Sequence, residues 1–166
     1  MRVEMNLQGV DGVLKTLQSL PPEVVAKRGG PVKLALAKGA RILRDQVKVN
    51  LQAAIAADGD NSTGLLLENV IASRGKPPFG GKGERYLVRV RRKAYPNRKA
   101  EKRGGVPTVR KSAALLEYGS SKQVARPSIR PAVRQKGAEV ISVVTSDLLR
   151  RIDLVVTKLA AQNKGR

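Results

Sequence analysis

The sequence predicts an α+β fold in one domain: two long helices packed on a small, mainly antiparallel sheet, with a long basic hairpin loop. Three observations predict it. Apolar residues recur at helical spacing over 31–56 and again from 128 to about 162. Between these stretches, short segments alternate apolar and charged residues, as half-buried strands do. The 166 residues suffice for one hydrophobic core, and no repeat suggests a second domain.

The two long helices are predicted from their apolar stripes and their start signals. Pro31 suits the first turn of the helix over 31–56. The stripe of this helix comprises Leu36, Ala40, Leu43, Val47, Leu51 and Ala54. Ser128 is placed to cap the second helix, and Pro131 fits its first turn. The second stripe comprises Ile141, Val144, Leu148, Ile152, Val155 and Leu159. The tail over 163–166 is expected to fray.

Shorter segments are expected to form the sheet and its connections. Residues 3–7 alternate apolar and polar side chains and predict a strand, which a short helix over 10–19 follows. Residues 64–72 are ambiguous between a helical turn and a strand. Residues 112–118 predict a short strand that Gly119 ends, because glycine permits a positive-φ turn.

A further strand is predicted over 85–94, and its two faces differ in chemistry. One face carries Tyr86, Val88 and Val90, whereas the other carries Arg85, Arg89 and Arg91. Clusters of glycine, proline and polar residues predict flexible loops at 57–63, 75–84 and 95–111. The glycines of the second loop lack the Lys-Ser or Lys-Thr ending of a phosphate-binding loop, so we interpret it as a connection only.

Composition narrows the classes of function. The chain contains 33 Lys and Arg against 13 Asp and Glu, a net charge of +20, which attracts polyanions. It has neither cysteine nor histidine, so it lacks disulfides, thiolate metal ligands and the usual general base near neutral pH. We therefore expect no catalytic residue, no metal site and no cofactor. No apolar run approaches membrane-spanning length, so we expect no membrane partner.

A basic arm over 85–111 is the clearest local signal of a partner. It contains eleven Lys or Arg and one acid, Glu101. A solvated charged surface is the simplest interpretation, but so many like charges favour a compensating anion. Few aromatic residues are near, so contact with DNA would involve phosphates and be independent of sequence. The alternative is an acidic neighbouring protein. The residues predicted to face the DNA or acidic partner are Arg89, Arg91, Arg92, Lys93, Arg98, Lys99, Lys102 and Arg103.

A corner is predicted over 115–133, where a strand turns into the last helix. Gly119 permits the turn, and Pro127 holds the preceding residue extended. Glu117 and Arg126 are expected to form an ion pair across this corner.

This corner resembles the tail-component family of long-tailed bacteriophages, encoded near the head–tail connector genes. Members typically carry a Glu-(Tyr/Phe)-Gly-(Thr/Ser) end and then an Ala-Arg-Pro-x-(Leu/Ile)-Arg-Pro-Ala helix start. The matching residues are Glu117, Tyr118, Gly119, Ser120, Ala125, Arg126, Pro127, Ile129, Arg130, Pro131 and Ala132. The helix around 37–44 and the turn at 63–65 follow the order of the family's landmarks, so the resemblance covers about 31–160.

The resemblance implies a structural virion protein without catalysis. Such a protein completes the tail or joins head to tail, as a homo-oligomeric ring (a hexamer or dodecamer) around the DNA channel. Its partners would be itself, neighbouring phage neck or tail proteins, and packaged DNA through non-specific contacts. It would reside in the virion after assembly in the bacterial host cytoplasm. The alternative is a cellular protein that binds nucleic acid independently of sequence, which the charge supports equally.

Overall fold

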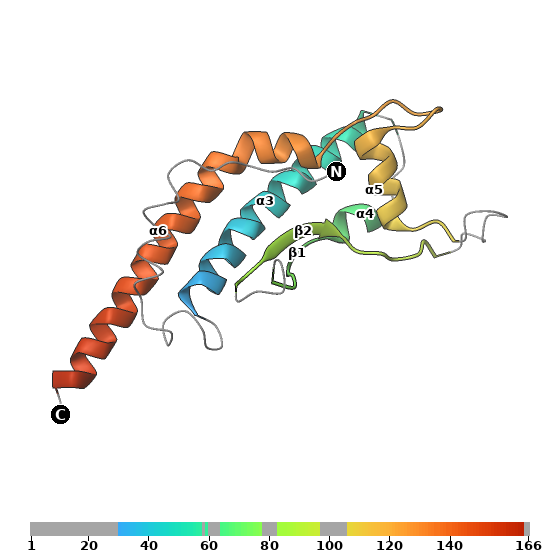
Figure 1. Cartoon of the computed structure of the whole chain (residues 1–166). Coiled ribbons are helices and arrows are strands. Elements are labelled where there is room, and N and C mark those ends of the chain that lie inside the picture. Colours follow the sequence, from blue (N-terminus) through green and yellow to red (C-terminus); the bar gives the residue numbers. More distant parts are fainter. Residues whose placement is uncertain (1–29, 58, 60–63, 78–82, 97–105, 165–166) are drawn as a thin grey trace.

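The computed structural model describes residues 30–57, 59, 64–77, 83–96 and 106–164 (Figure 1). Its elements in chain order are α3 (Pro31–Ala56), α4 (Leu65–Glu68), β1 (Val70–Arg74), β2 (Tyr86–Val90), α5 (Val109–Tyr118) and α6 (Ile129–Lys164). This is an α+β arrangement, as predicted. The strand predicted at 3–7 and the helix predicted at 10–19 lie outside the described residues.

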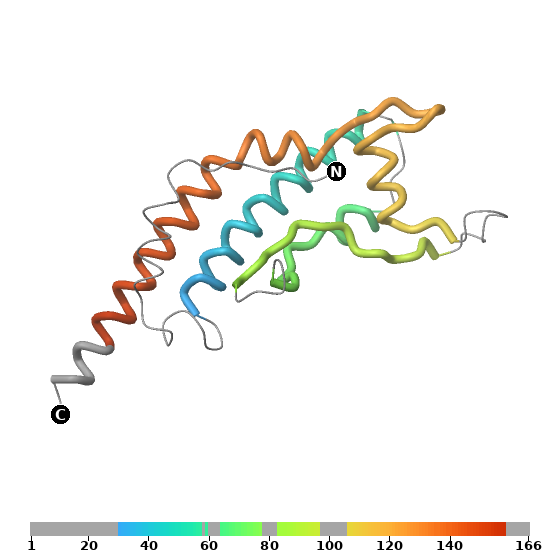
Figure 2. Tube along the Cα trace, in the orientation of Figure 1, coloured from blue at the N-terminus to red at the C-terminus, as the bar shows by residue number. Residues whose placement is uncertain are grey.

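The long helix α3 is the middle layer of the described fold. It runs antiparallel to α6 on one side and packs against β1 and β2 on the other (Figure 1). Helix α6 packs chiefly along α3, which lies between α6 and the sheet. The loop after α5 projects from the end of the molecule before the chain enters α6 (Figure 2). No helix in the described ranges combines the length and hydropathy needed to cross a lipid bilayer.

The bounds of α3 confirm the predicted helix, and Pro31 occupies its first turn. Two residues of the predicted stripe, Val47 and Leu51, are almost fully buried. They form the main core with Leu66, Val70, Val109 and Ala132. Full burial of a side chain of this size contributes about 1.5–3 kcal/mol. A second cluster joins α3 to α6 and comprises Ala35, Leu148 and Ile152.

Gly39 lets the two long helices approach closely. A Cβ atom at this position would lie 3.1 Å from Val140 Cγ1 and even closer to Val144 Cγ2, both on α6. Glycine inside a helix costs about 1 kcal/mol relative to alanine, so this position loses helix propensity and gains packing.

The ambiguous segment 64–72 contains both of the structures considered for it. Residues Leu65–Glu68 form a single helical turn, and the chain then enters β1. The two strands pair antiparallel, with a register that runs from Val70 opposite Val90 to Arg74 opposite Tyr86. The predicted strand over 85–94 is therefore correct in type but shorter.

Beyond β2, the two ends of the predicted basic hairpin lie side by side. Tyr95 N donates to Pro107 O at 3.1 Å, and Val109 N donates to Lys93 O at 2.8 Å. Residues 97–105, between these ends, lie outside the described residues.

The strand predicted over 112–118 is wrong, because this segment is part of helix α5. Thr108 occupies the N-cap position, and its Oγ1 accepts a hydrogen bond from Lys111 N at 3.3 Å. The buried residues Val109 and Glu117 are two helical turns apart, so they lie on one face. The segment is also rich in Ala and Leu, which favour helices. The basic loop consequently ends at Thr108 rather than at residue 111.

Candidate functional site

The corner between α5 and α6 is organised around the carboxylate of Glu117, whose side chain is only 4% exposed. Its Oε2 accepts hydrogen bonds from Ser128 N at 2.7 Å and from Ile129 N at 2.9 Å. Its Oε1 accepts one from Arg130 N at 3.1 Å. The next residue is Pro131, which has no N–H. One side chain from α5 therefore satisfies the donors of the first turn of α6.

Ser128 was predicted to cap α6, and the structure assigns the capping role to Glu117 instead. Ser128 does occupy the position before the helix, but its hydroxyl donates to Glu117 Oε2 at 3.4 Å. A carboxylate suits this place better than a hydroxyl because the helix N-terminus carries partial positive charge.

The ionisation of Glu117 follows from the same contacts. Burial raises its pKa, but the N–H groups of Ile129, Ser128 and Arg130, together with the Arg130 guanidinium, lower it by more. The pKa is therefore held below its usual range, and the cap is charged at neutral pH.

Arg130 links the end of α5 to the start of α6. Its Nε lies 3.1 Å from Glu117 Oε1, and its Nη2 donates to the Glu117 carbonyl oxygen at 2.7 Å. Its guanidinium carbon also lies 5.2 Å from the centre of the Tyr118 ring, a cation–π contact. Arg130 therefore contacts a carboxylate, a helix C-terminal carbonyl and an aromatic face at once.

The predicted ion pair between Glu117 and Arg126 is wrong, because Arg130 occupies that place beside the carboxylate. The prediction assumed a strand at 112–118, whereas a helix turns Glu117 toward the start of α6. The backbone of Arg126 has its own part in the corner, since its N–H donates to Leu116 O at 2.7 Å.

Gly119 makes the turn that follows α5. Its φ is +76° and its ψ is −177°, a combination that is essentially restricted to glycine. A Cβ atom there would lie 2.9 Å from Ala125 N and 3.0 Å from Gln123 O. Ser120 and Gln123 then pair with each other, with Ser120 N donating to Gln123 O at 2.8 Å. The prediction of a positive-φ turn at Gly119 is confirmed.

A polar network fastens the corner to α3. Asn50 Nδ2 donates to Ser128 O at 3.2 Å and to Gln135 Oε1 at 3.1 Å. Gln46 Nε2 donates to the same Gln135 oxygen at 3.1 Å. The corner is thus held by α3 as well as by its own helices.

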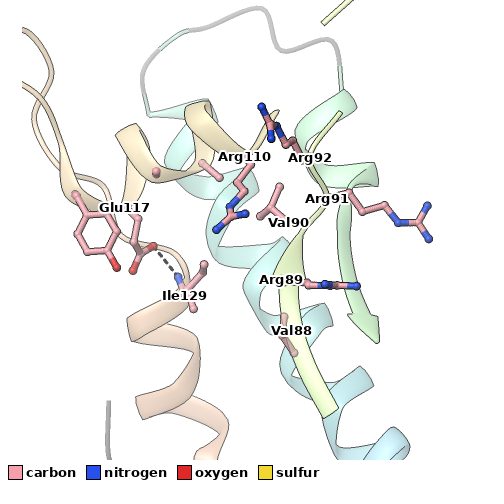
Figure 3. A pocket seen from close by; sticks show the side chains of 11 residues that line it. Val88, Arg89, Val90, Arg91, Arg92, Arg110, Glu117 and Ile129 are labelled. Carbon is pink, nitrogen blue, oxygen red and sulfur yellow. Dashed lines mark hydrogen bonds between the residues drawn. The ribbon is translucent and has the colours of Figure 1, made fainter. Parts of the chain in front are cut away.

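A groove of about 700 Å³ lies between β2 and α5. Its lining residues are Val88, Arg89, Val90, Arg91, Arg92, Arg110, Ala113, Ala114, Glu117, Tyr118 and Ile129. Figure 3 shows the Arg110 side chain extending into the space between α5 and β2 beside Val90, with Arg92 beyond Val90. It shows Arg89 and Arg91 extending from the other side of β2.

The predicted basic arm is divided by the structure. Arg89, Arg91, Arg92 and Lys93 are exposed on β2 and just after it. The remaining predicted contact residues, namely Arg98, Lys99, Lys102 and Arg103, lie outside the described residues. Arg110 was not among the predicted contact residues, and its place on α5 brings it to the groove. The signal that identifies it is helical spacing, which the strand assignment of 112–118 concealed.

A second buried carboxylate, Asp147 on α6, was not predicted to be important. Its side chain is 1% exposed and contacts three cations: Arg151 Nε at 2.5 Å, Lys38 Nζ at 3.2 Å and Arg150 Nη2 at 3.2 Å. The Arg151 hydrogen bond is the largest contribution that lowers the Asp147 pKa, which falls to about 2 despite burial. Because Lys38 belongs to α3, this cluster joins the two long helices.

Within the described ranges, no group of three His, Cys, Asp or Glu side chains is placed to hold a metal ion. Comparison of the chain with models of protein families, with curated proteins and with solved structures found no match.

Proposed function

We propose that the protein is a non-enzymatic structural component of a bacteriophage neck or tail, which completes the tail or joins head to tail as a ring around the DNA channel. The observation that carries the proposal is the corner between α5 and α6. Glu117, Gly119, Arg130 and Pro131 belong to the motif that resembles the phage tail-component family, and each has a geometric role there. Motif residues that fix the geometry of a turn between two helices suit a rigid structural subunit.

The arginine face of β2 supports contact with DNA. Arg89 and Arg91 extend from the side of the strand away from α5, and both are exposed (Figure 3). Guanidinium groups on an open surface bind phosphates without selecting a base sequence. Such contacts weaken steeply as salt rises, which suits a channel through which DNA must slide.

Exposed apolar side chains on the long helices support assembly with other subunits. On α6, Leu149, Leu154 and Val156 are 45%, 61% and 51% exposed, and on α3 Val49 is 61% exposed. Assembly into a ring would bury such side chains. Because the net charge of +20 opposes self-association, the ring is proposed to form on a partner rather than in free solution.

Copy number in particles tests this proposal. An epitope-tagged chain is expressed in host cells during infection by the encoding phage, and purified virions are analysed by quantitative mass spectrometry. A ring requires a fixed multiple, expected at six or twelve copies per particle. Absence from virions, or one copy, contradicts the proposal.

The same experiment addresses the second candidate, a cellular protein that binds nucleic acid independently of sequence. The exposed arginines of β2 favour it as much as they favour the first candidate. Such a protein would fractionate with the host nucleoid and not with virions.

A further inference from the structure

We infer that the groove between β2 and α5 is a docking site for an extended, acidic segment of a neighbouring neck or tail protein, which adds to β2 as a third strand. This inference rests on the proposed function for the identity of the neighbour. The chemistry of the segment follows from the groove itself.

The lining of the groove indicates that it follows the edge of β2. Residues 88–92 all contribute to it, although successive side chains of a strand point to opposite faces. Because Arg89 and Arg91 extend away from α5 (Figure 3), the groove reaches the backbone of this segment as well as the side chains of Val88 and Val90. The opposite wall is formed by Arg110, Ala113, Ala114, Glu117 and Tyr118, which recur at the spacing of one face of α5.

The backbone of β2 can pair with a further strand on this edge. Arg91 N donates to Asn69 O, and Arg85 O accepts from Gly75 N, so the odd-numbered residues of β2 direct their backbone groups toward β1. In an antiparallel ladder the residues between them direct theirs the other way, which leaves Val88 and Val90 facing the opposite edge. Within the part of the chain that the structure describes, the sheet has two strands. An extended peptide can use such an edge.

The side chains of the groove select an acidic segment with apolar residues. Val88, Val90, Ala113, Ala114 and Ile129 supply apolar contacts. Arg92 and Arg110 supply positive charge, and Figure 3 shows Arg110 extending between α5 and β2 beside Val90. Glu117 does not offset this charge toward a ligand, because its oxygens already accept from α6 and from Arg130. Opposite charges on the two partners would set the register of docking.

A protein segment fits these features better than DNA does. Phosphates and sugars lack the alternating N–H and C=O groups that a strand edge pairs with. The apolar wall also offers nothing to a phosphate. The groove and the arginine face of β2 are therefore assigned to different partners.

The test uses fluorescence anisotropy with the full chain and a short labelled peptide in which Asp and Val alternate. We expect the double variant Arg92→Ser and Arg110→Ser to weaken peptide binding about tenfold, because it removes charge-assisted hydrogen bonds. The matched control, Arg41→Ser with Arg134→Ser, removes the same charge from exposed positions on α3 and α6 that do not line the groove, and it should retain peptide binding. Ala114→Trp fills the groove without changing charge and should also weaken binding.

Each variant changes an exposed residue, so folding is checked by circular dichroism and is expected to persist. A second peptide alternates Asp with Pro, which retains the charge but lacks half of the backbone donors, and it should bind poorly. Equal binding of both peptides, or equal losses in the two double variants, overturns the inference. So does a mixed DNA duplex that displaces the peptide and depends on Arg92 and Arg110. Peptide binding that persists for a chain absent from virions contradicts only the proposed function.

Discussion

Replacing Glu117 with Ala tests the corner most directly, because one carboxylate serves the whole first turn of α6. The change leaves three backbone N–H groups and Arg130 Nε without their acceptor, while Arg130 Nη2 keeps the backbone carbonyl of residue 117. Loss of an ordinary N-cap costs about 0.5–2 kcal/mol, and removal of one partner of a buried ion pair costs about 3–5 kcal/mol. Since the Glu117 side chain is buried while Arg130 is half exposed, we expect about 3 kcal/mol, near the lower end of the second range. This corresponds to a fall in Tm of roughly 6–12 °C for a chain of this size.

The assay is thermal and urea unfolding followed by circular dichroism, with Glu139→Ala as the matched control. Glu139 lies on α6 and pairs with Lys136, but both side chains are substantially exposed, so its removal should cost no more than about 1 kcal/mol. Both variants lose one negative charge, so the difference between their unfolding free energies gives the contribution of the cap. If the unfolding free energy of Glu117→Ala is within about 1 kcal/mol of that of Glu139→Ala, the carboxylate does not hold the corner together. A double-mutant cycle should couple Glu117 to Arg130 more strongly than to Arg126.

Other parts of the chain give five further predictions. Gly119→Ala should destabilise by about 1–3 kcal/mol in urea melts, because its backbone conformation is restricted to glycine and its Cβ would meet Ala125. Gly39→Ala should cost about 1–3 kcal/mol by overpacking the contact between the long helices, although alanine favours a helix; unchanged stability would contradict the close approach. The Asp147 pKa of about 2 lies below its unfolded value of about 3.9, so its contribution to stability is present above pH 4 and is lost as pH falls toward 2. Asp147→Asn should therefore flatten unfolding free energy against pH in that window, and an unchanged slope would exclude the carboxylate as its cause. Arg89→Ser with Arg91→Ser should lower the slope of log K for duplex DNA against log salt by about 0.9 for each phosphate that the variant no longer binds, and an equal slope would place the DNA elsewhere. A variant with serine at four positions of the predicted basic loop should also lower this salt slope and should melt at the same temperature as the original chain. Those positions are Arg98, Lys99, Lys102 and Arg103. A lower melting temperature with unchanged DNA binding would contradict this prediction.

The long helices could be predicted because their signal is periodic over many turns. The bounds of α3 agree with the prediction, and α6 begins one residue after Ser128 and continues to Lys164. A short apolar segment carries no such signal. Residues 112–118 are too few for their spacing to separate a strand from a helix, and their packing, with Val109 and Glu117 on one buried face, identifies the helix.

The candidate site was predicted in part, because residue types identified its motif but its contacts depend on the orientation of α5. The corner residues were recognisable as a motif, and the positive φ of Gly119 followed from its residue type. The partner of Glu117 did not follow, because several arginines are close in sequence and the choice between Arg126 and Arg130 depends on which way α5 turns. Arg110 was missed as a groove residue because its position depends on the same helix.

The sequence by itself determined the two long helices, the alternating faces of β2 and the turn at Gly119. Each depends on interactions within a few residues, so spacing and residue type suffice. Only the tertiary structure decided two contacts between residues that are distant in sequence. Glu117 accepts from the N–H of Ser128, 11 positions later, and so caps α6. Asp147 contacts Lys38, 109 positions earlier. In a chain with 33 Lys and Arg, many cations are alike in sequence, and the burial of each carboxylate selects which of them it contacts.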